Sequence, residues 1–225
     1  MIFQKCIESV KSFPGAYVKP EAIIDLTRNL MKPVGGILLL LLALIPVARG
    51  EEASAMFAGG CFWCMEAAYQ GRKGVVDVVS GVTGGSRPNP TYQGNHEGHF
   101  EAVRVTYDPA VVSYQQLLDL FWVNVDPFDN RGQFCDKGPS YRSAIFPATE
   151  QEAALAEQSL AAVAKRFAPD RVYTEIRQAG RFWPVEDYHQ DYYLKNPVRY
   201  KYYRWNCGRD QRLKQIWGEQ AGAHP

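Results

Sequence analysis

The sequence predicts a mixed α+β fold, in which about four strands form a central, largely antiparallel sheet with helices packed against it. Three observations predict this fold. Runs rich in β-branched and aromatic residues are bounded by turn residues at 56–58, 75–82, 99–107 and 141–146. Ser113 and Thr149 each begin a helix-capping pattern, with Gln116 and Glu152 three residues further on. The 225 residues, 46% of them hydrophobic and 22% charged, suffice for one globular domain plus an extension.

Residues 1–50 carry the pattern of a secretory signal peptide. An uncharged apolar run at 34–47 follows Lys32 and is shorter than the ~20 residues of a usual membrane-spanning helix. The small residues Ala48 and Gly50 then offer a cleavage site. We expect an exported, periplasmic protein whose true start is Met31, with residues 51–225 as its folded domain. The alternative is an uncleaved segment that anchors the domain to the membrane.

The residues from Gly59 to Glu66 join the first strand to the first helix. Two glycines permit a sharp turn, and the residues after Cys61 contain no helix breaker before Gly71. Cys61 is therefore expected at a helix N-terminus, where free N–H groups and the helix dipole favour a thiolate. The alternative is a buried structural cysteine, since free cysteines are among the most buried residues.

The next two strands flank a loop. The β-rich run at 75–82 leads through Gly84 into a loop at 86–98 that is punctuated by proline, asparagine and glycine and contains Tyr92. From 99 to 107 the residues alternate, and period two places Glu101 on the more apolar row. A carboxylate that faces an apolar layer has a raised pKa and is a candidate proton donor. The alternatives are a solvated strand end or a pairing with an arginine.

The remaining elements follow in chain order. A capped amphipathic helix from 114 ends near 126, a loop at 128–139 holds Cys135 and Asp136, and a strand follows at 141–146. A long alanine-rich helix runs to 168 and a further strand covers 172–176. Residues 182–197 are aromatic and irregular, and the basic tail carries Cys207.

These motifs together resemble one known family. The family is peptide methionine sulfoxide reductase A, and its motifs agree in order and spacing over roughly 56–197. They are Gly60-Cys61-Phe62-Trp63 with Glu66, Gly81-Val82-Thr83-Gly84-Gly85, Asn89-Pro90-Thr91-Tyr92, Gly98-His99-Phe100-Glu101-Ala102-Val103 and Tyr141-Arg142-Ser143-Ala144-Ile145. The resemblance implies a two-layer ferredoxin-like sandwich with extra helices and a long irregular C-terminal segment. It also implies that residues 51–225 are a catalytic domain that reduces methionine S-sulfoxide, free or in proteins, and so repairs oxidised proteins.

The resemblance also implies roles for single residues. Cys61 is similar to the nucleophile that becomes a sulfenic acid, and Glu101 to the acid that protonates the sulfoxide oxygen. Phe62 and Trp63 resemble the walls that hold the substrate methyl group. Tyr92 and Tyr141 resemble the tyrosines that hydrogen-bond the oxygen, and Asp136 the aspartate that orders the polar network. No metal or organic cofactor is implied, because an external dithiol such as a thioredoxin-like protein supplies the electrons.

The resolving thiol departs from the family's commonest pattern. Many members resolve the sulfenic acid with cysteines of a glycine-rich tail, whereas this tail is basic and holds Cys207 alone. Position favours Cys207, with Cys64 a close second because it forms a Cys-x-x-Cys pair with Cys61. Cys135 is third.

Four other classes of function are alternatives to the reductase. A thioredoxin-like exchanger explains the Cys-x-x-Cys pair but leaves Glu101, Tyr92 and Tyr141 without a role. A zinc site of four cysteines would have only one Cys-x-x-Cys pair here. A metalloprotease helix needs His-Glu-x-x-His, which His96-Glu97-Gly98-His99 does not match. A plain aromatic binding module predicts no effect of Cys61→Ser. The net charge of +1 gives no attraction to nucleic acid, and a monomer is expected.

Overall fold

The computed structural model describes residues 51–94 and 96–222. The predicted signal peptide, the alternative anchor and the start at Met31 lie outside the described residues. Among the residues that are described, no helix combines the length and apolar character needed to cross a membrane.

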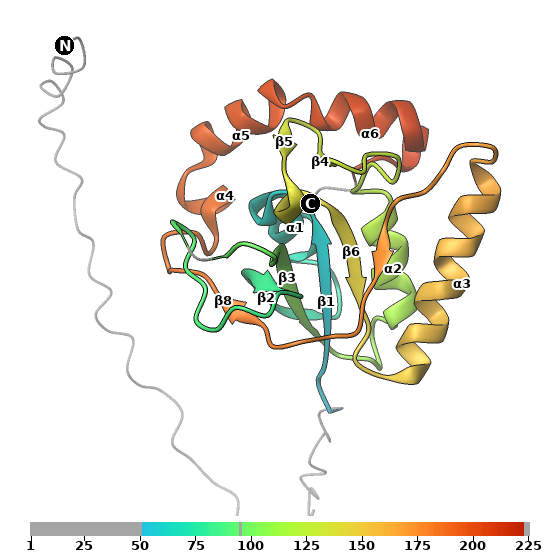
Figure 1. Ribbon diagram of the computed structural model, residues 1–225, viewed down its shortest axis with the longest axis horizontal. Coiled ribbons are helices and arrows are strands. Elements are labelled where there is room, and N and C mark those ends of the chain that lie inside the picture. Colours follow the sequence, from blue (N-terminus) through green and yellow to red (C-terminus); the bar gives the residue numbers. More distant parts are fainter. Residues whose placement is uncertain (1–50, 95, 223–225) are drawn as a thin grey trace, which may run out of the picture. The chain divides into compact units, whose positions relative to one another are not determined.

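A six-stranded mixed sheet forms the centre of the domain (Figure 1). Its strand order is β7-β6-β1-β3-β2-β8, and every neighbouring pair is antiparallel except β6 and β7. The strands are β1 (Ala53–Gly59), β2 (Val75–Thr83), β3 (Phe100–Tyr107), β6 (Ser143–Phe146), β7 (Glu175–Ile176) and β8 (Trp183–Pro184). The four longest are the predicted central strands, and β7 lies within the further strand predicted at 172–176. The two-residue β8 extends the edge within a segment expected to be irregular.

The chain order of strands and helices confirms the ferredoxin-like core. The succession β1-α1-β2-β3-α2-β6 with the spatial order β6-β1-β3-β2 is the βαββαβ arrangement. The helices are α1 (Phe62–Tyr69), α2 (Tyr114–Trp122), α3 (Glu150–Arg166), α4 (Tyr192–Lys195), α5 (Pro197–Asn206) and α6 (Arg209–Trp217). A small hairpin of β4 (Gly132–Gln133) and β5 (Asp136–Lys137) lies within the predicted loop.

The main core lies between the sheet and the helices α1 and α2. Phe57 of β1 stacks on Tyr69 of α1 with ring centroids 5.2 Å apart, and on Phe121 of α2 at 5.6 Å. Val103 and Val105 of β3 face the same cluster. Because Glu101 shares their row, this packing directs its carboxylate toward the first turn of α1, as the alternation predicts.

The opposite face of the sheet is also covered. Phe100 and Ala102 of β3 form a second apolar cluster that Phe182 and Ala179 cover. Arg142 lies over the Phe100 ring, 5.1 Å from its centroid. Both rows of β3 are therefore buried, which fixes the strand that carries Glu101 from two sides.

The predicted helix caps are confirmed. The Ser113 hydroxyl accepts a hydrogen bond from the Gln116 backbone N–H at 3.2 Å, and the Gln116 side chain accepts one from the Ser113 N–H at 2.9 Å. Thr149 caps α3 through the N–H of Glu152 at 3.1 Å. These bonds satisfy N–H groups that a helix start leaves without partners.

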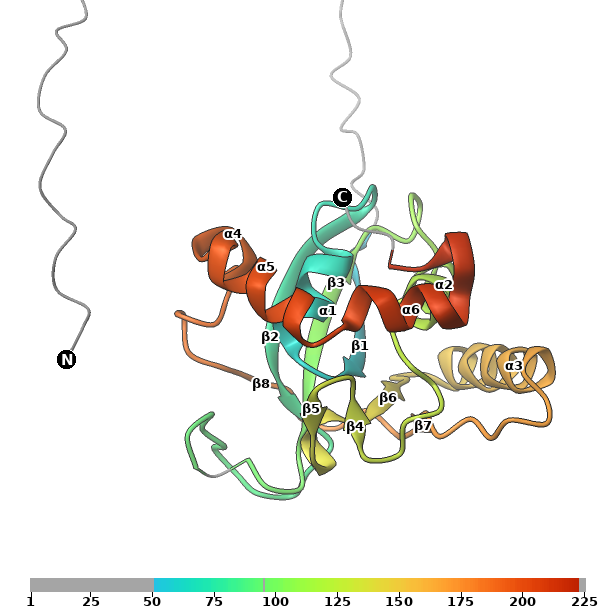
Figure 2. The ribbon, with the colours of Figure 1, turned by 90° about the horizontal axis from the view of Figure 1, so that it is seen from above.

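The C-terminal segment differs from the irregular one expected. It is largely irregular from 167 to 191, but beyond that point α4, α5 and α6 follow one another across α1 (Figures 1 and 2). The sequence hides these helices because Pro197 and Gly208 divide them into short pieces, and their aromatic residues have modest helix propensity.

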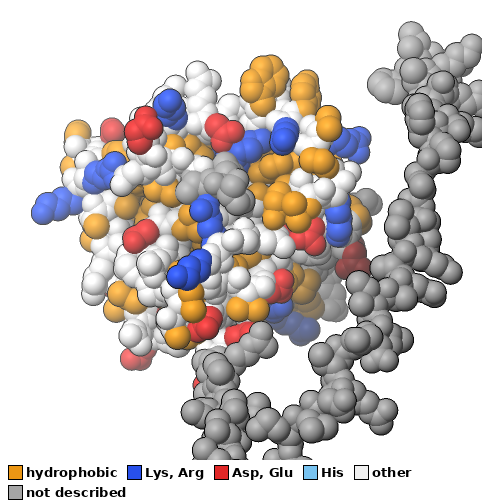
Figure 3. All heavy atoms as spheres, turned by 180° about the vertical axis from the view of Figure 1, so that it is seen from behind, with side chains coloured by type: hydrophobic (Ala, Val, Ile, Leu, Met, Phe, Trp, Pro, Cys, Tyr) orange, Lys and Arg blue, Asp and Glu red, His pale blue; other side chains and the backbone are white. Residues whose placement is uncertain are grey.

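The helix α5 has an unusual distribution of apolar residues. Val198, Tyr202 and Trp205 are 81%, 66% and 74% exposed on its outer side. Figure 3 shows hydrophobic side chains among Lys and Arg in the upper right part of that view, where α4 and α5 lie. The inner side instead carries the buried Tyr200 and Arg204, so α5 contacts the cysteines with polar groups.

Candidate active site

Cys61 lies at the N-cap of α1, as predicted. Its φ of −52° and ψ of 120° are non-helical, and its carbonyl accepts the first bonds of the helix, from Cys64 N at 3.1 Å and Met65 N at 3.4 Å. Gly60 has φ +83°, and a Cβ there would lie 2.6 Å from Cβ of Gln133. The turn therefore requires glycine both for its conformation and for space.

Cys61 and Cys64 form a buried, hydrogen-bonded pair of free thiols. Burial raises the pKa of Cys61 well above its usual value. The hydrogen bond to Cys64, the charge of Cys64 and the charge of Glu101 each raise it further. The pKa of Cys64 falls to about 5, chiefly through the hydrogen bond from Cys61 and then through the charges of Arg209 and Arg204. The pair therefore loses its first proton at Cys64, to which the Cys61 thiol donates, rather than at Cys61 as its place at the helix start predicted.

Glu101 lies beside the start of α1 and is 1% exposed. Its Oε2 accepts a hydrogen bond from the Phe62 backbone N–H at 3.2 Å, whereas the buried Oε1 has no hydrogen-bond partner among the described residues. Burial raises the pKa of Glu101 to about 8, the Phe62 N–H opposes the rise and the charge of Asp136 adds to it. At neutral pH the carboxyl group is therefore mostly in its protonated form.

Aromatic rings pack around Cys61 and the first turn of α1. The Phe62 ring lies 5.8 Å from that of Tyr92 and 5.2 Å from the imidazole of His189. The Trp63 indole N–H donates to Nδ1 of His189 at 3.2 Å. Trp63 also stacks on Tyr192, with centroids 3.7 Å apart. The walls of the site therefore come from α1, the loop of Tyr92, the segment that precedes α4 and the start of α4 itself.

Two tyrosine hydroxyls and one carboxylate complete the polar part of the site. Burial and the neighbouring charge of Glu101 raise the pKa of Tyr92 to about 12, and the same causes raise that of Tyr141 further. Both are therefore neutral hydroxyl donors. Tyr141 ends a 3₁₀ turn (Pro139–Tyr141) rather than beginning the strand expected there. Burial also raises the pKa of Asp136, although a hydrogen bond from Tyr203 opposes the rise.

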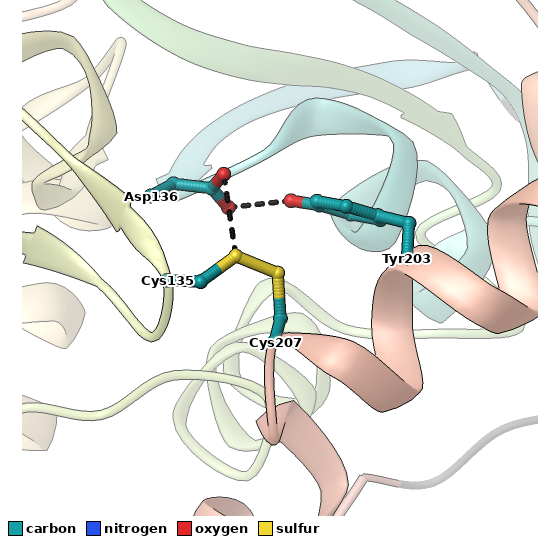
Figure 4. The surroundings of a disulfide bond; sticks show 4 residues. All are labelled: Cys135, Asp136, Tyr203 and Cys207. Carbon is teal, nitrogen blue, oxygen red and sulfur yellow. Dashed lines mark hydrogen bonds between the residues drawn. A yellow bond between two sulfur atoms is a disulfide. The ribbon is translucent and has the colours of Figure 1, made fainter.

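A disulfide joins Cys135 to Cys207, with Cα atoms 4.8 Å apart (Figure 4). Figure 4 shows that the Asp136 carboxylate contacts both the Cys135 sulfur and Tyr203, whose hydroxyl donates to it. Cys135 is exposed, whereas Cys61 and Cys64 are buried. Four cysteines allow three pairings, and the sequence does not choose among them; it favoured Cys207 only as the thiol that resolves Cys61. Two of the four thiolates that the zinc hypothesis needs are joined to each other instead.

Several site residues were missed by sequence reasoning. His189 and Tyr192 stood out only as members of an aromatic segment, whereas Tyr203 and Arg209 lie in the tail that was noted only for Cys207 and its basic residues. None carries a local signal that separates it from a core residue. His99 holds the loop of Tyr92: its Nδ1 accepts a hydrogen bond from Gly85 N at 3.2 Å and its Nε2 bonds the Arg87 carbonyl at 2.9 Å.

Comparison with known proteins identifies the family. The family pattern described as Peptide methionine sulfoxide reductase matches residues 53–221. The chain belongs to the peptide methionine sulfoxide reductase family. It is 50% identical over 175 residues to Peptide methionine sulfoxide reductase MsrA 2 of Caulobacter vibrioides, covering 76% of this chain and 89% of that one. It is 45% identical over 172 residues to MsrA of Bacillus subtilis, covering 75% and 97%.

Solved structures of this reductase family agree with the fold. Methionine sulfoxide reductase A of Corynebacterium diphtheriae superposes with a TM-score of 0.61 at 32% identity, over 69% of this chain and 81% of that one. Mxr1 of Saccharomyces cerevisiae in reduced form gives 0.59 at 25% identity, over 66% and 87%. The resemblance inferred from the sequence motifs is confirmed, and the thioredoxin-like alternative does not account for this family and fold.

Proposed function

We propose that this protein reduces methionine S-sulfoxide, free or in oxidised proteins, to methionine and so repairs oxidative damage. The observation that carries the proposal is the placement of a protonated, buried Glu101, with its free Oε1, beside Cys61 within an aromatic enclosure. A sulfoxide oxygen leaves only when it is protonated, and sulfur is a soft electrophile that suits a thiolate nucleophile.

In the proposed first step Cys61 attacks the sulfoxide sulfur as its own proton passes to the Cys64 thiolate. Glu101 delivers a proton to the oxygen, which Tyr92 and Tyr141 hydrogen-bond. The oxygen moves to Cys61 as a sulfenic acid and methionine leaves, so the substrate sulfur is reduced and the Cys61 sulfur is oxidised by two electrons. Phe62 and Trp63 hold the methyl group during this step.

We assign the second step to Cys64 ahead of Cys207. Cys64 is already hydrogen-bonded to Cys61, whereas Cys207 forms a disulfide with Cys135. The Cys64 thiol condenses with the sulfenic acid, which forms the Cys61–Cys64 disulfide and releases water. This assignment reverses the preference that chain position gave.

The exposed Cys135–Cys207 disulfide takes the third step in this proposal. A thioredoxin-like dithiol cannot approach the buried pair directly but can attack the exposed Cys135 sulfur. The dithiol of Cys135 and Cys207 then reduces the Cys61–Cys64 disulfide by exchange, so electrons pass from the partner to the inner pair. The partner ends as a disulfide and both cysteine pairs return to the start of the cycle.

Single-turnover stoichiometry tests these assignments. The full chain is reduced and freed of reductant, mixed with the S epimer of N-acetyl-methionine sulfoxide, and assayed for methionine formed, thiols lost and disulfides by mass spectrometry. Two methionines per chain are expected from the wild type, one from Cys207→Ser or Cys135→Ser with a Cys61–Cys64 disulfide, and none from Cys61→Ser. Cys64→Ser should form one methionine and retain a sulfenic acid.

Each contrary result removes a specific part of the proposal. No methionine from the wild type removes the reductase function and restores a thiol exchanger. If Cys207→Ser, rather than Cys64→Ser, accumulates the sulfenic acid, Cys207 is the resolving residue. One methionine per wild-type chain removes the transfer between the two cysteine pairs. The R epimer, expected to give no methionine, serves as the substrate control.

A further inference from the structure

Arg209 places a buried guanidinium against the backbone that presents the cysteine pair. It is the first residue of α6 and is 2% exposed. Its Nη2 donates to the Gly59 carbonyl at 3.1 Å and to the Asn124 carbonyl at 2.7 Å, and lies 3.5 Å from Sδ of Met65. These contacts reach the chain just before Cys61 and just after Cys64.

No ion pair with a carboxylate is found for Arg209 among the described residues. The neighbouring arginines differ, because Arg204 pairs with Asp210 and Arg212 with Asp126. Phe134 lies 4.4 Å from the Arg209 Cζ and offers only a cation–π contact. A buried cation without a counter-ion is costly, so the fold must supply negative charge nearby.

The Cys61–Cys64 pair is the acidic group beside this guanidinium, because Gly59 and Met65, which Arg209 contacts, flank the two cysteines in the chain. The pKa of Cys64 falls first through the hydrogen bond from Cys61 and next through the positive charge of Arg209. The charge of Arg209 also acts to lower the pKa of Asp136, but the Asp136 carboxylate already accepts a hydrogen bond from Tyr203. The other titratable groups that act on the pair are Glu101 of β3, Tyr200 and Arg204 of α5, and the tyrosines 92, 141 and 203.

We propose that Arg209 is a positioning residue of this site, the buried counter-ion of the single thiolate that Cys61 and Cys64 share. Its bond to the Gly59 carbonyl also fixes the turn that aims the Cys61 sulfur. The inference deepens the proposed function, because the same thiolate accepts the Cys61 proton in the first step. It further explains why a helix close to the C-terminus is packed against a site that the N-terminal half of the domain forms.

Site-resolved alkylation of the full chain tests this role. The Cys135–Cys207 disulfide is kept oxidised, iodoacetamide is added over a range of pH, and mass spectrometry quantifies labelling of the peptide that holds Cys61 and Cys64. In Arg209→Gln the midpoint of the labelling rate should rise by about one to three pH units, the range for loss of a nearby opposite charge. Arg212→Gln is the matched control, because it removes a half-exposed arginine of the same helix, and its midpoint should equal that of the wild type.

The proposal is overturned if Arg209→Gln is folded, as wild-type near-UV circular dichroism would show, and its labelling rate has the same pH midpoint as the wild type. Where this variant does not fold, Arg209→Lys decides, because it keeps the charge: an unchanged midpoint supports the counter-ion role and a risen one overturns it. The readout is independent of turnover. Failure of the reductase function appears instead as absence of methionine from the wild type.

Discussion

The replacement Glu101→Gln isolates the proton donor of the proposed reaction. Glutamine keeps the size of the side chain and an oxygen that can accept the Phe62 N–H, a bond of 3.2 Å in the native protein. It cannot release a proton to the sulfoxide oxygen. Since general acids contribute about 10²- to 10⁴-fold to rates, kcat/KM should fall by a factor in that range.

The structure also gives the expected pH dependence. With the pKa of Glu101 raised to about 8, the acid form outnumbers the ionised form about tenfold at pH 7, and the ratio is inverted at pH 9. The wild-type kcat/KM should therefore fall about tenfold between these values. On the acid side the pKa of Cys64, lowered to about 5, predicts loss of rate as the shared thiolate becomes protonated. The pH profile of kcat/KM should therefore be bell-shaped, with apparent pKa values near 5 and 8.

Steady-state assays with N-acetyl-methionine S-sulfoxide over this pH range provide the measurement. Glu101→Gln should lose the alkaline limb and keep the acid one. Glu66→Gln is the matched control, because Glu66 is also a buried carboxyl with its pKa raised to about 7 by burial, yet it bonds the Asp191 backbone N–H at 3.0 Å rather than the site. An alkaline limb that persists in Glu101→Gln, or that vanishes in Glu66→Gln, refutes the assignment of the acid.

Three further predictions concern the walls and the scaffold of the site. Gly60→Ala should destabilise the protein by about 1–3 kcal/mol and lower its activity, because the position has φ +83° and an added Cβ would contact Gln133. Chemical denaturation measures this loss of stability, and an unchanged denaturation midpoint contradicts the prediction. Trp63→Phe removes the indole donor to His189 and should raise KM more than it lowers kcat, which steady-state kinetics will decide. Ser113→Ala should cost about 1 kcal/mol through loss of the capping box yet leave kcat/KM unchanged; thermal unfolding and activity assays test the two parts, and a fall in activity would show that this helix end affects the site.

Short-range patterns determined much of the site. The two glycines and the breaker-free run placed Cys61 at a helix start, and alternation along the strand placed Glu101 on the buried row. Both features depend on residues only a few positions apart, where steric limits and side-chain period act directly. The capping box at Ser113 and the side-chain cap at Thr149 were predictable for the same reason. Motif order then identified the family before any contact was known.

Tertiary structure decided which distant residues complete the site. The bond from Trp63 to His189 spans 126 positions, and that from Arg209 to Gly59 spans 150. No local period or propensity encodes such pairs, because they arise only when the short C-terminal helices fold back across α1. The partner of Cys207 was open for the same reason, since four cysteines of one domain allow three pairings and only the packing of α5 against the β4–β5 hairpin selects Cys135. The sequence alone thus identified the family and placed the proposed nucleophile and the proposed acid, whereas the fold decided the position of Arg209, the aromatic enclosure and the second cysteine pair.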